Sequence, residues 1–113
     1  MINKDMMPDV YSTNEVKTNK IWIDGKPIYR IVFKTNSWQS SISISSLNIE
    51  TPIDAYGYVY TNGNQWRHLP FYGSAENNST IYVKTNELVI TSGTGGYCKG
   101  PLQIIFEYTK TTD

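Results

Sequence analysis

Apolar and polar positions alternate along much of this chain with the two-residue period of a β-strand. In residues 40–49, Ile42 and Ile44 fall on one side and the serines on the other. Residues 54–61 contain a tyrosine ladder, Tyr56, Tyr58 and Tyr60, whose opposite face carries Ala55, Gly57 and Val59. Successive strand residues point to opposite sides of a sheet, so both segments predict half-buried strands.

The densest apolar run, IWIDGKPIYRIVF at residues 21–33, is interrupted by Asp24-Gly25. Asp-Gly between apolar runs favours a two-residue type I′ hairpin, which needs positive φ at both central residues. That turn places Ile23 opposite Lys26 and Trp22 opposite Pro27. Pro27 then belongs to a pair without hydrogen bonds, so its missing N–H leaves the hairpin intact. No other strand is expected to bond to Pro27 from its far side.

Turn-forming residues separate the remaining apolar segments. The sequence TNGNQ at 61–65 predicts a turn, and Pro70 is expected to end a short strand within 66–73. Residues 80–84 and 87–91 predict a second hairpin around Thr85-Asn86. A glycine-rich loop at 92–101 leads to a final strand, LQIIFEYTK, at 102–110.

This pattern predicts an all-β fold with seven to eight short strands, an antiparallel β-sandwich that is jelly-roll-like. A chain of 113 residues is one domain, and it can bury about two-thirds of its unfolded surface. Residues 1–19 are polar and lack periodicity, so they are expected to form an N-terminal arm or linker. The β-sandwich domain is expected to span residues 20–113.

Composition and charge narrow the classes of function. Tyr, Thr, Ile, Ser, Asn and Gly dominate, which is typical of strands and turns. The ten basic and ten acidic side chains are scattered singly, so no cluster for nucleic-acid binding is expected. No apolar stretch approaches the length of a membrane span, and no signal peptide is expected. Cys98 is the only cysteine, which excludes an intrachain disulfide.

No segment carries a recognisable catalytic or cofactor-binding motif. Counted from Gly93, Cys98 stands where a P-loop needs its second glycine. His68 is the only histidine and lacks zinc-ligand spacing. The carboxylates are isolated, whereas glycoside hydrolysis needs a matched pair. The chain is therefore predicted to be non-enzymatic, with no metal and no cofactor.

Aromatic residues are the informative class, with nine Tyr, three Trp and three Phe. A ring in a loop can stack on the face of a sugar while neighbouring polar groups bond to the hydroxyls. The same residue types anchor protein–protein contacts, and core packing is a third interpretation. The candidate ligand-binding residues are Trp38, Trp66, Arg67, Tyr72, Asn77 and Tyr97.

The hairpin and the tyrosine ladder leave more apolar surface than one core can cover. The ladder either faces outward, onto a subunit or ligand, or lies in the core. In the hairpin, one face carries isoleucines and Val32 broken by Arg30, and the other carries the aromatic rings. The aromatic face needs a second cover, which is either residues 1–19 folded back over it or a neighbouring subunit. If a neighbouring subunit is the cover, Arg30 would face a carboxylate across this seam. The candidate interface residues are Trp22, Tyr29, Arg30, Phe33, Tyr56, Tyr58 and Tyr60.

Both ends of this sequence resemble a family of small virion proteins from tailed bacteriophages. Residues 22–30, WIDGKPIYR, match that family's segment W-I-D-G-K-P-[IL]-Y-R, which follows a polar lead and precedes an apolar strand. Residues 108–113, YTKTTD, match the family's ending. Between the two ends the match is looser. The stretches LPFYGS and TNELVI are similar to the family's sequences, whereas SSISISSLNIETP at residues 40–52 is not.

The resemblance implies a β-rich module of a tail fibre, baseplate, tail tip or head fibre, located in the virion after synthesis in the host cytoplasm. Such modules are typically homotrimers, which favours a neighbouring subunit as the cover of the aromatic face, and many bind host-surface glycans. The expected partners are copies of the chain, other virion proteins through the arm, and a host cell-wall glycan. The leading hypothesis is host attachment, and the alternative is a decoration or assembly protein without a ligand. A depolymerase is disfavoured because no carboxylate constellation is present.

Overall fold

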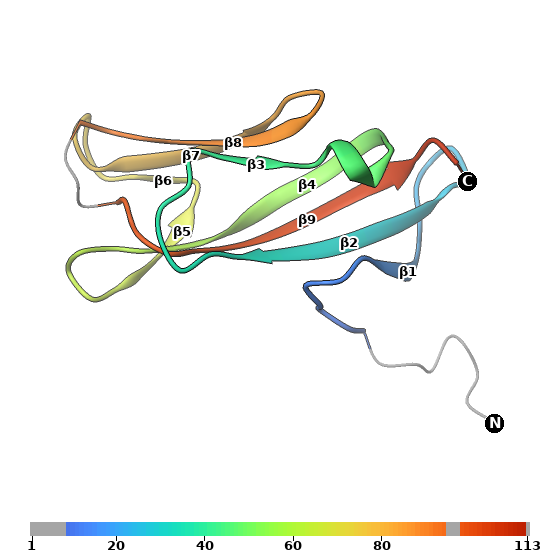
Figure 1. The fold of residues 1–113 in the computed structure, drawn as a ribbon, viewed down its shortest axis with the longest axis horizontal. Helices are drawn as coiled ribbons and strands as arrows, with labels where there is room; N and C mark the ends of the chain where they lie inside the picture. Colours follow the sequence, from blue (N-terminus) through green and yellow to red (C-terminus); the bar gives the residue numbers. More distant parts are fainter. Residues whose placement is uncertain (1–8, 95–97, 113) are drawn as a thin grey trace.

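Two antiparallel sheets lie face to face in the computed structural model (Figure 1), which describes residues 9–94 and 98–112. The five-stranded sheet has the order β1-β2-β9-β4-β5, and the four-stranded sheet has the order β3-β8-β7-β6. The predicted antiparallel β-sandwich is confirmed, with nine strands among the described residues. The strands are β1 (Val16–Ile21), β2 (Pro27–Lys34), β3 (Ser41–Ser43), β4 (Ile49–Tyr60), β5 (Trp66–Leu69), β6 (Phe71–Tyr72), β7 (Asn78–Val83), β8 (Glu87–Ser92) and β9 (Leu102–Lys110).

Part of the sandwich is jelly-roll-like, because strands that are distant in the sequence lie next to one another in the sheets. Strands β2, β3 and β4 alternate between the sheets, while β9 inserts between β2 and β4, and β8 pairs with β3. In contrast, β4 and β5 form a hairpin within one sheet, and β6, β7 and β8 follow one another within the other. The final strand therefore occupies the centre of the five-stranded sheet.

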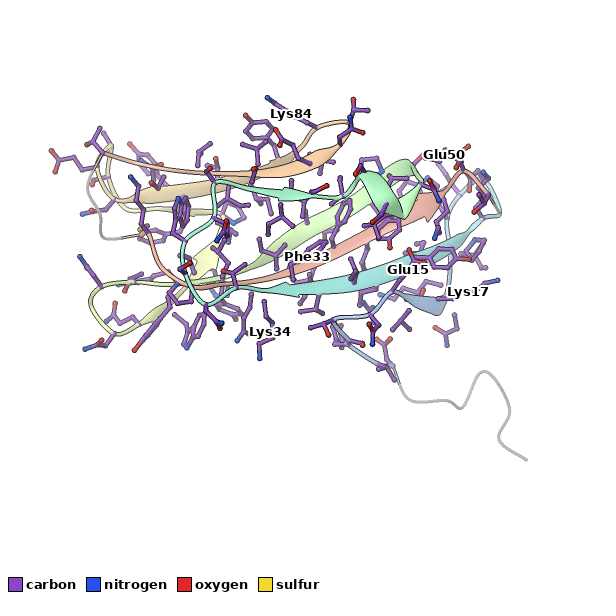
Figure 2. All side chains as sticks on the ribbon, viewed as in Figure 1. Glu15, Lys17, Phe33, Lys34, Glu50 and Lys84 are labelled. Carbon is purple, nitrogen blue, oxygen red and sulfur yellow. The ribbon has the colours of Figure 1, made fainter. Side chains whose placement is uncertain are left out.

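The core lies between the sheets and is built from alternate residues of the strands. The side chain of Phe33 points from β2 into this space (Figure 2). The predicted facing of Ile42 and Ile44 is confirmed, because Ile44 is buried in the core and Ile42 packs against it. The buried cluster consists of Ile44, Val59, Leu69, Leu88, Ile90, Leu102, Ile104, Phe106 and Tyr108.

Gly57 allows β4 and β9 to approach each other closely. A Cβ atom at this position would lie 1.9 Å from the backbone oxygen of Gln103. Any larger residue would push the two central strands apart, so glycine is required here for steric reasons.

The β1–β2 hairpin differs from the predicted two-residue turn. The N–H of Gly25 donates to the carbonyl of Trp22 at 2.9 Å, and the N–H of Trp22 donates to the carbonyl of Lys26 at 2.8 Å. Gly25 has a φ of 87°, whereas Asp24 is not among the described residues with positive φ. This is a three-residue loop, a type I turn followed by a bulge at glycine. The predicted register is therefore wrong by one residue, and Ile21 faces Pro27.

A side-chain hydrogen bond explains this turn. The carboxylate of Asp24 accepts the N–H of Lys26 at 3.0 Å. Asp often bonds to the backbone two residues further on, and this bond favours an ordinary turn conformation over the left-handed one.

The face of β2 that packs in the core is the opposite of the expected one. Tyr29 and Phe33 pack against the core, because the large rings fill the space between the sheets. Arg30 lies on the outer face of the five-stranded sheet, where it is only 1% exposed. The aromatic face of the hairpin is thus the core face and not a seam between subunits.

Part of the expected arm attaches to the five-stranded sheet beside β2. The carbonyl of Ser12 accepts the N–H of Val32 at 2.9 Å. Glu15 accepts a hydrogen bond from the hydroxyl of Tyr108 and pairs with Lys110 at 2.7 Å. The strand β1 starts at Val16, which lies inside the range 1–19 expected as an arm. Residues 1–8 of that range lie outside the described residues.

Candidate binding face

The outer face of the five-stranded sheet carries five of the thirteen predicted site residues. Ala55 and Val59 of β4 belong to or pack against the core, so the tyrosine ladder points to the opposite, outer side. Leu69 of β5 is also in the core. Because facing alternates along a strand, the side chains of His68 and Trp66 point to the outer side. The outward facing of the ladder, one of the two predicted possibilities, is confirmed.

Four rings lie together at one end of this face, and we call Tyr58, Tyr60, Trp66 and His68 the aromatic strip. Tyr58 faces His68 across β4 and β5, with ring centroids 4.8 Å apart. Tyr60 faces Trp66, and their rings meet edge to face at 5.0 Å. Tyr58 is 42% exposed and Trp66 is 48% exposed. The strip therefore presents flat, accessible ring surface on an open sheet.

The turn at 61–65 sets this arrangement. The N–H of Thr61 donates to the carbonyl of Gln65 at 2.8 Å, and Asn64 takes a φ of 61°, which Asn tolerates better than most residues. This confirms the predicted turn. The closed hairpin aligns Tyr60 with Trp66 and Tyr58 with His68 on the same side.

An ionic cluster around the buried Arg30 occupies the other end of the face, and we call Asp9, Tyr11, Arg30 and Glu107 the arm latch. Nε of Arg30 donates to Glu107 at 2.8 Å, and Nη1 donates to Asp9 at 2.6 Å. The guanidinium carbon lies 4.1 Å from the centre of the Tyr11 ring. These contacts satisfy a cation that the sheet would otherwise bury at high cost.

The latch shifts the pKa values of its members. Burial opposes the charge of Arg30, but hydrogen bonds to Asp9 and Glu107 outweigh it and raise the pKa of Arg30 above its usual value. The hydrogen bond from Arg30 lowers the pKa of Asp9, whose side chain is half exposed. Burial raises the pKa of the neighbouring Tyr56, and Tyr11 adds to the shift.

The structure does not bring the predicted ligand residues together. Only Trp66 lies in the aromatic strip. Trp38 packs against the core, and the guanidinium of Arg67 lies 5.2 Å from the ring of Phe71. Tyr72 is exposed on β6 of the other sheet, and the carbonyl of Asn77 closes a turn by accepting the N–H of Gly73. Tyr97 lies outside the described residues.

The predicted interface residues are likewise divided. Tyr29 and Phe33 pack against the core, and Trp22 is half-buried in the hairpin loop. The outer face carries the remaining four, which are Arg30, Tyr56, Tyr58 and Tyr60. The expectation that Arg30 meets a carboxylate of another subunit is wrong, because both of its carboxylate partners belong to the same chain.

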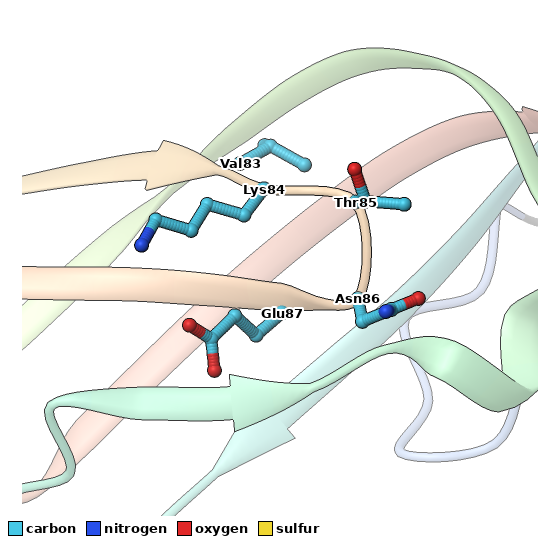
Figure 3. A pocket seen from close by; sticks show the side chains of 5 residues that line it. All are labelled: Val83, Lys84, Thr85, Asn86 and Glu87. Atoms are coloured by element: carbon cyan, nitrogen blue, oxygen red, sulfur yellow. The ribbon is translucent and has the colours of Figure 1, made fainter.

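A hollow beside the β7–β8 turn is lined by Val83, Lys84, Thr85, Asn86 and Glu87 (Figure 3). All five residues come from one continuous segment, so the hollow lacks the convergence of several elements that a ligand site needs. Among the described residues, no group of three or more His, Cys, Asp or Glu side chains could hold a metal ion.

Cys98 lies away from this face and is 1% exposed. Burial raises the pKa of its thiol, and Arg67 offsets part of that shift. A buried thiol with a raised pKa is a poor nucleophile.

Comparisons with known proteins give no relative. No protein-family model, curated protein or solved structure matches the chain. Within residues 9–94 and 98–112, no helix is long and apolar enough to cross a membrane.

Sequence reasoning missed the neighbours that complete the aromatic strip. His68 lacks zinc-ligand spacing, and Lys34 and Gln103 belong to no motif, so none of the three is a predicted site residue. Reading the 61–65 turn as a closed hairpin would have aligned Tyr58 with His68. Nothing local to the sequence reveals that β9 brings Gln103 beside Tyr58.

Proposed function

We propose that this chain is a non-enzymatic structural module of a bacteriophage virion, on a tail or head appendage, and that it contributes to attachment to a host-surface glycan. The observation that carries the attachment role is the aromatic strip, in which Tyr58 and Trp66 are each nearly half exposed on the outer face of the sheet. The resemblance of residues 22–30 and 108–113 to phage virion proteins supports the location.

The chemistry of the strip suits a sugar. The apolar face of a pyranose ring stacks on an aromatic ring, while its hydroxyl groups need polar partners. Gln103 faces Tyr58 from β9, and the Tyr hydroxyls are donors and acceptors at the same surface. An open face fits a polymer bound along its length, because Tyr58 and Trp66 are both accessible on neighbouring strands of the sheet.

A glycan array tests the attachment role, followed by titration with the saccharides that bind. Trp66→Ala and Tyr58→Ala are each expected to weaken binding about tenfold, since a lost stacking ring costs on the order of 1 kcal/mol or more. Tyr82→Ala is the matched control, because Tyr82 is 47% exposed on the other sheet. Binding by the folded protein that is indifferent to Trp66 and Tyr58, or no binding to any glycan, would refute the role.

The alternative is a decoration or assembly protein without a ligand. The observation in its favour is the tip of the β1–β2 hairpin, where Ile23 is 92% exposed and Ile21 is 62% exposed. Exposed isoleucines at the tip of a hairpin are suited to insertion into an apolar site of a neighbouring protein. Under this alternative, Ile23→Ser prevents incorporation into particles while the array stays blank. Normal incorporation of Ile23→Ser would argue against it.

A further inference from the structure

A single row of exposed side chains crosses four strands of the five-stranded sheet. Lys34 of β2 faces Gln103 of β9, Gln103 faces Tyr58 of β4, and Tyr58 faces His68 of β5. All four residues are exposed. Figure 2 shows Lys34 pointing away from the four-stranded sheet, on the outer side. Three strand spacings make this row roughly 14 Å long, which is enough for an oligosaccharide.

Lys34 gives this row a positive charge. Within the described part of the chain, Lys34 forms no ion pair with a carboxylate. Two acids on the outer face, Asp9 and Glu107, are paired with Arg30 in the arm latch. Asp54 faces Glu107, four residues and roughly 13 Å along β4 from Tyr58. The ammonium group of Lys34 thus belongs to the same row as the accessible ring of Tyr58, two strands away, and no described carboxylate pairs with it.

We propose that the row binds an acidic polysaccharide containing uronic acid. One sugar ring stacks on Tyr58 between His68 and Gln103, the amide of Gln103 bonds to its hydroxyls, and the carboxylate of the same or the next sugar pairs with Lys34. This proposal rests on the proposed function and adds the charge of the ligand.

A carboxylate on a pyranose fits the row better than a polyol phosphate. The rings need flat sugar faces, which an open polyol chain lacks. A phosphate polymer also carries a charge on every repeat, and several cations are needed to neutralise it, whereas this row offers only Lys34. One ammonium group matches one carboxylate held next to a stacked ring.

The test compares a panel of uronic-acid oligosaccharides with their carboxyl-reduced, neutral counterparts, by calorimetric titration of the full chain. We expect each uronate that binds to lose about fivefold in affinity on reduction, the size of one exposed ion pair. Lys34→Gln is expected to cause the same loss for the uronate and none for the neutral sugar. It should also remove the salt dependence of binding. Lys84→Gln, on the β7–β8 turn, is the matched control.

The outcomes separate the two proposals. Equal binding of acidic and neutral forms, or a Lys34→Gln protein that binds uronate normally, overturns the acidic ligand and leaves the proposed function standing. Tighter binding of a polyol-phosphate polymer than of any uronate also overturns it. If neither form of any saccharide binds the folded chain, the proposed function fails as well.

Discussion

Arg30 shows how one residue reconciles burial with charge on this sheet. It is 1% exposed, and its guanidinium meets Glu107, Asp9 and the ring of Tyr11. The sequence predicts that an arginine within an apolar run needs a carboxylate. It cannot identify which one, because Glu107 is 77 positions away and comes opposite Arg30 only through the pairing of β2 with β9.

Removing one member of this pair should be costly. Glu107→Gln keeps the shape of the side chain but leaves the buried cation with less compensation. We expect the free energy of unfolding to fall by about 3 kcal/mol, as for other broken buried pairs, measured by urea denaturation. The matched control is Glu50→Gln, which breaks the more exposed pair with Lys26 and should cost less than about 1 kcal/mol. Equal losses for the two variants would show that burial does not set the cost.

At the scale of elements, the sequence predicts strands better than the turn between β1 and β2. The bounds of β9 agree with the prediction, and β5 ends at Leu69 before Pro70, because period-two alternation and proline act locally. The type I′ turn was wrong because a side-chain bond from Asp24 to Lys26 decided the local conformation.

Folding of the arm over the hairpin was one of the two predicted covers, and residues 9–15 do attach there, but on the face of Arg30 rather than on the aromatic face. The sequence did not identify that face, since a polar segment without periodicity gives no sign of the surface it covers.

Attachment of the arm is expected to depend on pH through Asp9. Its pKa is lowered in the folded protein by the bond from Arg30, so the carboxylate stabilises the attached state above the unfolded pKa of 3.8. That contribution is lost as the pH falls through the lower, folded value. We expect the hydrogen-exchange protection of the Val32 amide, which bonds to Ser12, to drop several-fold in this acidic range.

The variant Asp9→Asn separates this effect from general acid unfolding. It should show the reduced protection of Val32 already at neutral pH, with little further change attributable to this site on acidification. The amide of Ile90, which bonds to Ser40 in the other sheet, is the internal control. Parallel loss at Val32 and Ile90 in the native sequence would mean that the whole fold opens rather than the arm.

At the scale of the molecule, the order of the strands in the two sheets could not be predicted from the sequence. Composition and turn spacing predict a sandwich, but loop-separated strands leave many pairings open. The insertion of β9 between β2 and β4 is what assembles the row from Lys34 to His68. A candidate site made of residues from four strands therefore becomes visible only in the folded chain.

Self-association is the prediction at this scale. We expect sedimentation at micromolar concentration to give a mass above that of one chain, with the trimer favoured by the family resemblance. We expect the exposed tip at Ile21 and Ile23 to form the contact, because this leaves the aromatic strip open, so Ile23→Ser should shift the protein toward the monomer. A stable monomer of the native sequence would contradict association. If Tyr58→Ala rather than Ile23→Ser dissociated the oligomer into monomers, the aromatic strip would be the interface between subunits.

Alternate residues of β4 are under different structural constraints. Ala55, Gly57 and Val59 face inward and are constrained by packing, and Gly57 in particular has no room to change. The tyrosines between them face outward, where substitutions leave the core intact. Substitutions at alternate positions can therefore change the exposed surface while the scaffold stays fixed, which makes this strand a suitable template for laboratory selection of new binding specificities.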